Sequence, residues 1–137
     1  MNNEEKKEKL RKYLITVDRL KLKCDDAARW ESISFGPSGI IQNKTGRSGP
    51  DEIKETAIQL RQECETLAVE VRNLRQEMDE ALSNMKDDRL RVLLESKYID
   101  GMSDKELCEK KHFSDRHMRR LMTQAIRELD RSSSFFS

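Results

Sequence analysis

The chain has 137 residues, a formal net charge of +1, a charged fraction of 39% and a hydrophobic fraction of only 35%. Compact domains are usually about 45–50% apolar and about 25% charged, so this composition excludes one large globular core. No apolar run approaches the roughly 18 residues of a membrane span, and the regular spacing of the apolar residues argues against full disorder. The sequence predicts an all-α protein with long, solvated helix faces and one small packed domain at most.

The N-terminus predicts a cytoplasmic location, because it is charged and no apolar stretch of a secretory signal follows it. Three cysteines, Cys24, Cys64 and Cys108, include no CxxC pair, and an odd number argues against a disulfide framework. Cys108 with His112 and His117 lacks an obvious fourth ligand for zinc. We expect reduced thiols that pack as small apolar side chains, and neither a metal ion nor a cofactor.

One stretch interrupts the helical pattern. Residues 32–50 hold four of the five glycines and both prolines, which predicts a Gly/Pro/Ser-rich linker. We expect an N-terminal helix at 1–31 before it and a long, coiled-coil-like helix at 51–85 after it. A tri-helical helix-turn-helix domain at 86–131 and a tail at 132–137 complete the predicted organisation.

Both long helices carry apolar residues at alternating spacings of three and four, the a/d pattern of a coiled coil. Glutamates at g and basic residues at e of the second strip favour a parallel homodimer, in which Glu70 meets Arg75 of the other chain. We therefore expect a homodimer or higher homo-oligomer that forms through this strip: Ile53, Leu60, Leu67, Val71, Leu74 and Met78.

Two other pairings of the strip stay open. If the first helix folds back antiparallel through the linker, its Lys9 and Lys23 face the glutamates of the second helix. Such a hairpin fits a dimeric four-helix bundle, and it also fits a monomer. The sequence leaves the geometry of self-association undetermined.

From Lys86 onward the pattern is helix, short helix, three-residue break and longer helix. Gly101 ends the first of these helices, and Ser103 with Glu106 forms a capping box for the second. Ser114 is the expected cap of the third. Its expected apolar face consists of Met118, Leu121, Met122, Ala125, Ile126 and Leu129. This order is that of the DNA-binding helix-turn-helix, although a tri-helical unit can also bind proteins.

Charge separates these two interpretations. Six basic side chains and one carboxylate lie between Lys110 and Arg127. A helix face whose charges have the same sign is typical of a DNA interface. The alternative is a salt-bridged face without function. Lys110, Lys111 and Arg127 are placed to neutralise phosphate, and Asp115 to complement the helix dipole. We expect the helix from Ser114 to enter the major groove, with these residues on or near the DNA: Lys110, Lys111, Ser114, Asp115, Arg116, His117, Arg119, Arg120, Thr123, Gln124 and Arg127.

Two groups of proteins resemble this region. Region four of sigma factors, which recognises promoters, is similar to the pattern Leu93-Leu94-x-x-x-Tyr98-Ile99-x-Gly101-x-Ser103-x-x-Glu106-Leu107, followed by Ser114-x-Arg116-His117-Met118-x-Arg120-Leu121-x-x-x-Ala125-Ile126. Small phage proteins of Gram-positive hosts related to the late-gene regulators ArpU and RinA are more similar still, also in the layout of the N-terminal part. The resemblance implies a transcriptional regulator, an activator of phage genes, that acts in the bacterial host cell.

The sequence also departs from these relatives. His112 replaces the glycine that is common in the turn, and a positive φ is less favourable for histidine. Lys111 occupies a place that is more often apolar. The polymerase-binding and melting regions of a sigma factor are not recognisable, so the chain is not a self-sufficient sigma factor.

The predicted function is sequence-specific binding of double-stranded DNA. A small terminase subunit, which joins a helix-turn-helix to an oligomerising helical part, is the first alternative. A protein-interaction module that binds host RNA polymerase or another phage protein is the second. An enzyme is not expected, because Gly36–Gly39 lacks the Lys-Ser/Thr of a phosphate loop and the histidines have no catalytic partner at motif spacing.

Overall fold

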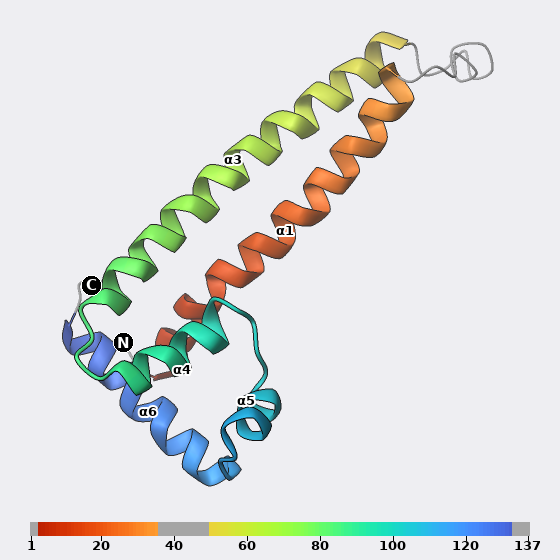
Figure 1. Cartoon of the computed structure of the whole chain (residues 1–137). Coiled ribbons are helices and arrows are strands. Elements are labelled where there is room, and N and C mark those ends of the chain that lie inside the picture. The colour runs from red at the N-terminus through yellow and green to blue at the C-terminus, as the bar shows by residue number, and fades with distance from the viewer. Residues whose placement is uncertain (1–2, 36–49, 133–137) are drawn as a thin grey trace. The chain divides into compact units, whose positions relative to one another are not determined.

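The computed structural model describes residues 3–35 and 50–132, with side chains at 3–34 and 51–129. Within these ranges the chain forms α1 (Asn3–Phe35), α3 (Pro50–Ser83), α4 (Asp88–Tyr98), α5 (Asp104–Lys111) and α6 (Asp115–Ser132) (Figure 1). The described residues contain no strand, so the all-α prediction is confirmed. None of the described helices combines the length and the apolar character that crossing a membrane requires.

The start of the predicted linker is wrong. Residues 32–35 continue α1 instead of leaving it. The helix persists because the first strong helix breakers are Gly36 and Pro37, and a proline disfavours helical geometry at the residue before it. Pro50, the last residue of the predicted linker, is the first residue of α3, where a proline is tolerated. Residues 36–49 of the predicted linker and the Phe135-Phe136 tail lie outside the described residues.

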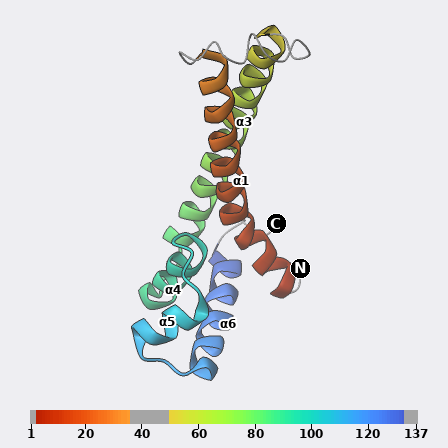
Figure 2. The same ribbon diagram turned by 90° about the vertical axis from the view of Figure 1, so that its right-hand side faces the viewer.

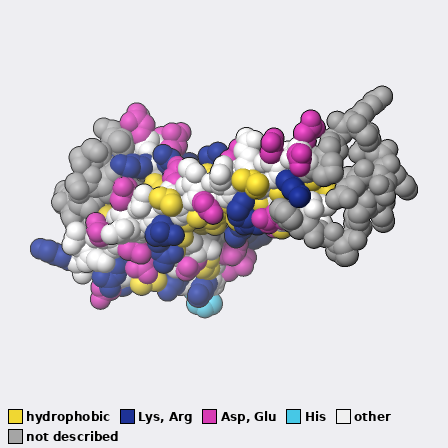
Figure 3. All heavy atoms as spheres, turned by 90° about the horizontal axis from the view of Figure 1, so that it is seen from above, with side chains coloured by type: hydrophobic (Ala, Val, Ile, Leu, Met, Phe, Trp, Pro, Cys, Tyr) yellow, Lys and Arg dark blue, Asp and Glu magenta, His cyan; other side chains and the backbone are white. Residues whose placement is uncertain are grey.

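The chain divides into two compact units. One unit spans Thr16–Val71, and the other joins Met1–Ile15 to Arg72–Ser137. The predicted helix-turn-helix domain at 86–131 lies in the second unit, which also includes the N-terminal part of α1 and the C-terminal part of α3. Acidic, basic and apolar side chains are mixed over the face drawn in Figure 3, as expected of solvated helices.

The unit Thr16–Val71 is an antiparallel helical hairpin. Its segments of α1 and α3 run side by side in both Figures 1 and 2. Lys23 Nζ lies 3.0 Å from Glu63 Oε2, so a lysine faces a glutamate as the fold-back alternative requires. Arg61 Nε also donates to Glu31 Oε2 at 3.1 Å. The apolar strip therefore pairs within one chain in this unit.

The residues expected to mediate self-association differ in how deeply they are buried within the chain. Ile53 and Leu67 are buried in the hairpin and Met78 is buried in the other unit. Leu60, Val71 and Leu74 are half-buried. Self-association through this strip stays a prediction.

We expect the hairpin to lose stability in acid. Hydrogen bonds from Arg61 to Glu31 and from Lys23 to Glu63 hold the pKa of each carboxyl below its ordinary value of 4.5. A carboxyl pKa that is lowered by folding stabilises the fold above the unfolded-state pKa, and this stabilisation disappears as the pH falls through the folded-state pKa. Thermal unfolding from pH 7 downward should therefore show a loss of stability below about pH 4.5.

The control for this experiment is the double variant Glu31→Gln, Glu63→Gln, which keeps the shape of both side chains and removes their titration. Its melting temperature should decrease less in acid than that of the unmodified chain. Both pairs are partly exposed to solvent, so the difference should shrink in high salt. An equal decrease in the variant and the unmodified chain would show that the two pairs do not stabilise the hairpin.

In the second unit, each of α4, α5 and α6 contacts the other two. Gly101, at φ 80°, lies in the loop after α4, where the sequence places a helix stop. Arg75 Nη1 donates to the hydroxyl oxygen of Tyr13 at 3.2 Å and so joins α3 to α1 in this unit. The buried side chains of the three C-terminal helices are Leu90, Leu93, Leu94, Tyr98, Leu107, Met118, Met122, Ala125, Ile126 and Leu129.

Candidate nucleic-acid interface

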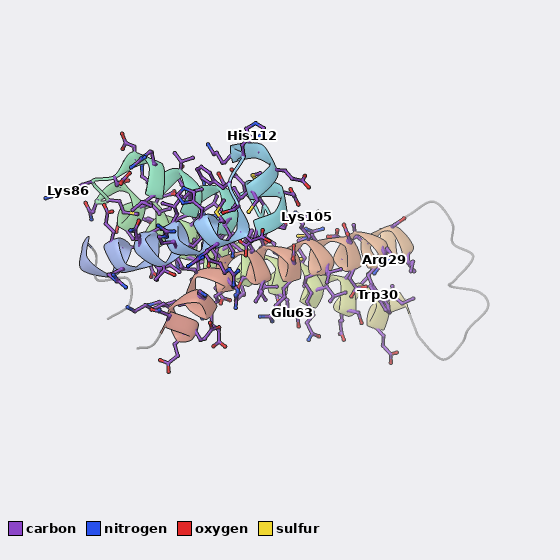
Figure 4. All side chains as sticks on the ribbon, turned by 90° about the horizontal axis from the view of Figure 1, so that it is seen from below. Arg29, Trp30, Glu63, Lys86, Lys105 and His112 are labelled. Carbon is purple, nitrogen blue, oxygen red and sulfur yellow. The ribbon has the colours of Figure 1, made fainter. Side chains whose placement is uncertain are left out.

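The connection between α5 and α6 consists of three residues, 112–114. The sequence places this break one residue earlier, at 111–113, but Lys111 continues α5. His112, labelled at the end of α5 in Figure 4, adopts a left-handed conformation with φ 58° and ψ 41°. The backbone N–H groups of His112 and Phe113 both donate to the carbonyl of Cys108. Ser114 Oγ then accepts from the backbone N–H of His117 at 3.2 Å and caps α6. The break thus ends α5 and starts α6 with its backbone groups satisfied.

We expect His112→Gly to stabilise the protein by about 0.5–1 kcal/mol, because glycine adopts a left-handed conformation without the steric cost that a Cβ causes. Chemical denaturation should show the increase in the free energy of unfolding. The matched control is Glu109→Gly, an exposed position inside α5, where glycine should destabilise by roughly 1 kcal/mol. A loss of stability in His112→Gly would mean that the histidine side chain itself holds the turn.

Helix α6 buries one side and exposes the opposite one. Met118 and Leu129 mark the buried side. Because successive residues of a helix are about 100° apart, Arg116, Arg120 and Arg127 fall on the opposite side, and all three are exposed. Among the described side chains, no ion pair involves any of these three arginines. We call them, together with the exposed Lys110 and Lys111, the outer basic surface.

The predicted site residues on one flank of α6 face the protein as well as solvent. Arg119, Thr123 and Asp115 line a recess of about 420 Å³ with side chains of α1, α4 and α5. Asp115 Oδ1 accepts from the Cys108 thiol at 3.5 Å. Desolvation of the thiol, and then this hydrogen bond, raise the pKa of Cys108 above its ordinary 9.0. Asp115 therefore supports the turn. Its position in the first turn of α6 is the one in which the sequence predicts that it complements the helix dipole.

His117 and Gln124 lie on the other flank of α6. They line a mainly apolar groove of about 540 Å³ against the first turns of α4, together with Leu121 and Lys111. Leu121 was expected on the buried face, but it is half-buried because it faces this groove. The ring of Phe113 meets that of His117 edge-on, with 4.7 Å between the centroids, at one end of the groove.

Two carboxylates that the sequence analysis did not single out position α4 against α6. Glu128 Oε1 accepts from the backbone N–H groups of Lys86 at 2.9 Å and Asp87 at 3.0 Å. Asp87 Oδ1 in turn caps α4 by accepting from Arg89 N–H at 2.9 Å. An aspartate before a charged first turn is a helix-start signal that predicts the cap. Nothing in the sequence indicates the contact of Glu128, which joins residues 42 positions apart.

The structure thus places one set of the predicted site residues on the outer side of α6 and two further sets on its two flanks. Among the described residues there is no group of three or more His, Cys, Asp or Glu side chains that could hold a metal ion. The outer basic surface is exposed, and its basic side chains form no ion pair among the described side chains. Arg119 is likewise exposed and without an ion pair there, but it lines the recess on the flank of α6.

Comparison with known proteins gives one match. The model of DUF1492, a family described as a protein of unknown function, matches residues 40–130, about two thirds of the chain. The matched range contains α3, α4, α5 and nearly all of α6, and so the whole outer basic surface. No curated protein and no solved structure matches the chain.

Proposed function

The chain belongs to the DUF1492 family, and we propose that it is a sequence-specific DNA-binding transcriptional regulator. The observation that carries this proposal is the row of exposed arginines, Arg116, Arg120 and Arg127, on the side of α6 opposite the core. Within the part of the chain that the structure describes, these arginines form no ion pair that would hold the fold, whereas they match the charge of a phosphate backbone.

In this proposal α4, α5 and α6 act as a helix-turn-helix with α6 as the recognition helix. The major groove is about 12 Å wide and admits one helix. Arg116 and Arg120 are one turn apart near the N-terminal end of α6, where base contacts occur in such motifs. Arg127 lies about 10 Å further along the helix, and with Lys110 and Lys111 it is suited to phosphate.

The regulatory role rests on likeness of sequence. The patterns from Leu93 to Leu107 and from Ser114 to Ile126 resemble region four of sigma factors and the phage regulators related to ArpU and RinA. We therefore propose a regulator of phage genes, an activator, that acts in the cytoplasm of a bacterial host. A dimer or higher oligomer of it should prefer paired half-sites about one helical turn of DNA apart, or a multiple of that spacing.

Selection of DNA from a random pool, followed by measurement of the mass of the bound complex, tests the proposal. We expect an enriched sequence, a complex with two chains, and an affinity that falls steeply as salt is raised. Failure to bind duplex DNA even in low salt would overturn the proposal and favour a protein-interaction module. Ring-sized assemblies would favour a small terminase subunit instead.

A further inference from the structure

Cys24 and Cys64 face each other across the α1–α3 hairpin. Cys64 is buried, with 3% of its surface exposed, and Cys24 is half-buried. The neighbouring Cys24 thiol is one of the causes that raise the pKa of the Cys64 thiol, after burial. Both residues belong to the unit Thr16–Val71, in which their helices run side by side.

The neighbouring contacts set the register that brings the two thiols together. Lys23 and Glu63, which directly precede Cys24 and Cys64, form an ion pair of 3.0 Å; Glu63 is labelled in Figure 4. Ala27 and Ala57 occupy buried core positions of the same hairpin, with 0% and 1% exposure. Small side chains let two helices approach closely, and a disulfide requires Cα atoms within roughly 4.4–6.8 Å.

The two thiols differ in reactivity. Burial, and then the hydrogen bond with Cys24, raises the pKa of Cys64 above its ordinary 9.0, while Arg61 and Lys23 act in the opposite direction. Cys64 is therefore a poor nucleophile toward an oxidant in solvent. Cys24 is the more accessible of the two, so oxidation should begin there, with Cys64 as the resolving thiol.

We propose that Cys24 and Cys64 form a dithiol redox site, at which a peroxide closes an intrachain disulfide between α1 and α3. The Cys24 thiolate attacks one oxygen of hydrogen peroxide, the O–O bond breaks, and the leaving hydroxide takes up a proton to become water. The Cys64 sulfur then attacks the sulfur of the Cys24 sulfenic acid. The S–O bond breaks, and the hydroxyl leaves as water with the proton of the Cys64 thiol. Two thiols are oxidised and one peroxide is reduced to two waters.

Closure of this disulfide locks the hairpin within one chain. A covalent link between α1 and α3 prevents the two helices from separating, and so keeps Ile53 and Leu67 buried within one chain. The link closes a loop of about 40 residues. Because a cross-link of that length restricts the unfolded chain, oxidation should raise the melting temperature by roughly 10 °C.

Alkylation of the full chain under denaturing conditions tests the proposal. The reduced chain should show three reactive thiols, at Cys24, Cys64 and Cys108. After treatment with hydrogen peroxide only Cys108 should react, and the mass should show the loss of two hydrogens. Digestion should then yield a peptide pair joined through Cys24 and Cys64. A reducing agent should restore all three thiols and reverse the increase in melting temperature.

Two variants serve as matched controls, and circular dichroism verifies that each is folded. Cys108→Ser should still form the link and should then retain no reactive thiol. Cys24→Ser should form no link and should show no increase in melting temperature. Three reactive thiols after peroxide treatment of the folded chain would overturn the proposal. A link through Cys108, a link between chains, or irreversible oxidation of Cys24 in place of a disulfide would also overturn it.

Discussion

Replacing Arg120 by alanine is expected to weaken binding to the selected DNA site by about 1–3 kcal/mol, a factor of roughly 5–150, and to relax the sequence preference. The guanidinium group is suited to bidentate contact with guanine in the major groove. Arg120 is exposed on the outer side of α6 and contributes nothing to the core, so the variant should remain folded. Arg116→Ala should behave in the same way.

Titration of the selected duplex, and of duplexes with single base substitutions, measures both effects. The matched control is Arg89→Ala on α4, which removes the same charge from a side chain that is 91% exposed and lies outside the outer basic surface. Arg127→Ala should weaken binding to all sequences alike and reduce the salt slope by about 1. If Arg89→Ala and Arg120→Ala weakened binding equally, base recognition by α6 would be ruled out.

Leu107→Ala is expected to lower the free energy of unfolding by about 2–5 kcal/mol. Leu107 is 0% exposed. It is also the one buried residue among those of α5, all of which the structure describes. Truncation leaves a cavity and removes the main apolar contact that holds α5 against α4 and α6. Because α5 carries the turn into α6, binding to DNA should decrease as well.

Denaturant unfolding measures this loss, and Leu22→Ala is the matched control. Leu22 undergoes the same chemical change at a position that is 70% exposed, where substitution should alter stability by no more than about 0.5 kcal/mol. Similar stabilities of Leu107→Ala and the unmodified chain would mean that α5 is held by contacts other than its buried leucine. The position of α6, and with it that of the outer basic surface, would then depend on contacts other than the burial of Leu107.

Much of the local structure was predictable, because the interactions behind it join residues close in the chain. Ser103 accepts from Glu106 N–H at 3.1 Å and Ser114 from His117 N–H at 3.2 Å, each three residues away. The break at His112 and the helix stop at Gly101 follow from the same short-range rules. The predicted start of the linker was wrong, because a composition that is averaged over a segment does not locate the residue at which a helix ends.

The partner of an apolar strip was not predictable. A heptad pattern shows that a helix buries one side, but a second copy and a second helix of the same chain satisfy it equally well. The structure pairs α1 with α3 through Lys23 and Glu63, and so favours the hairpin within one chain. In this pairing Cys24 is a neighbour of Cys64.

The sequence by itself therefore determined the helices, their caps and the basic character of α6. These features depend on hydrogen bonds between residues a few positions apart and on the spacing of apolar and charged residues along each helix. The outward direction of Arg116 and Arg120 also follows from the periodicity of the helix. Tertiary structure alone decided the partners of the carboxylates. Packing brings the Cys108 thiol to Asp115 and the backbone at the start of α4 to Glu128. The physical reason is that contacts between residues far apart in the chain depend on how whole helices pack, and a local pattern carries no information about that packing.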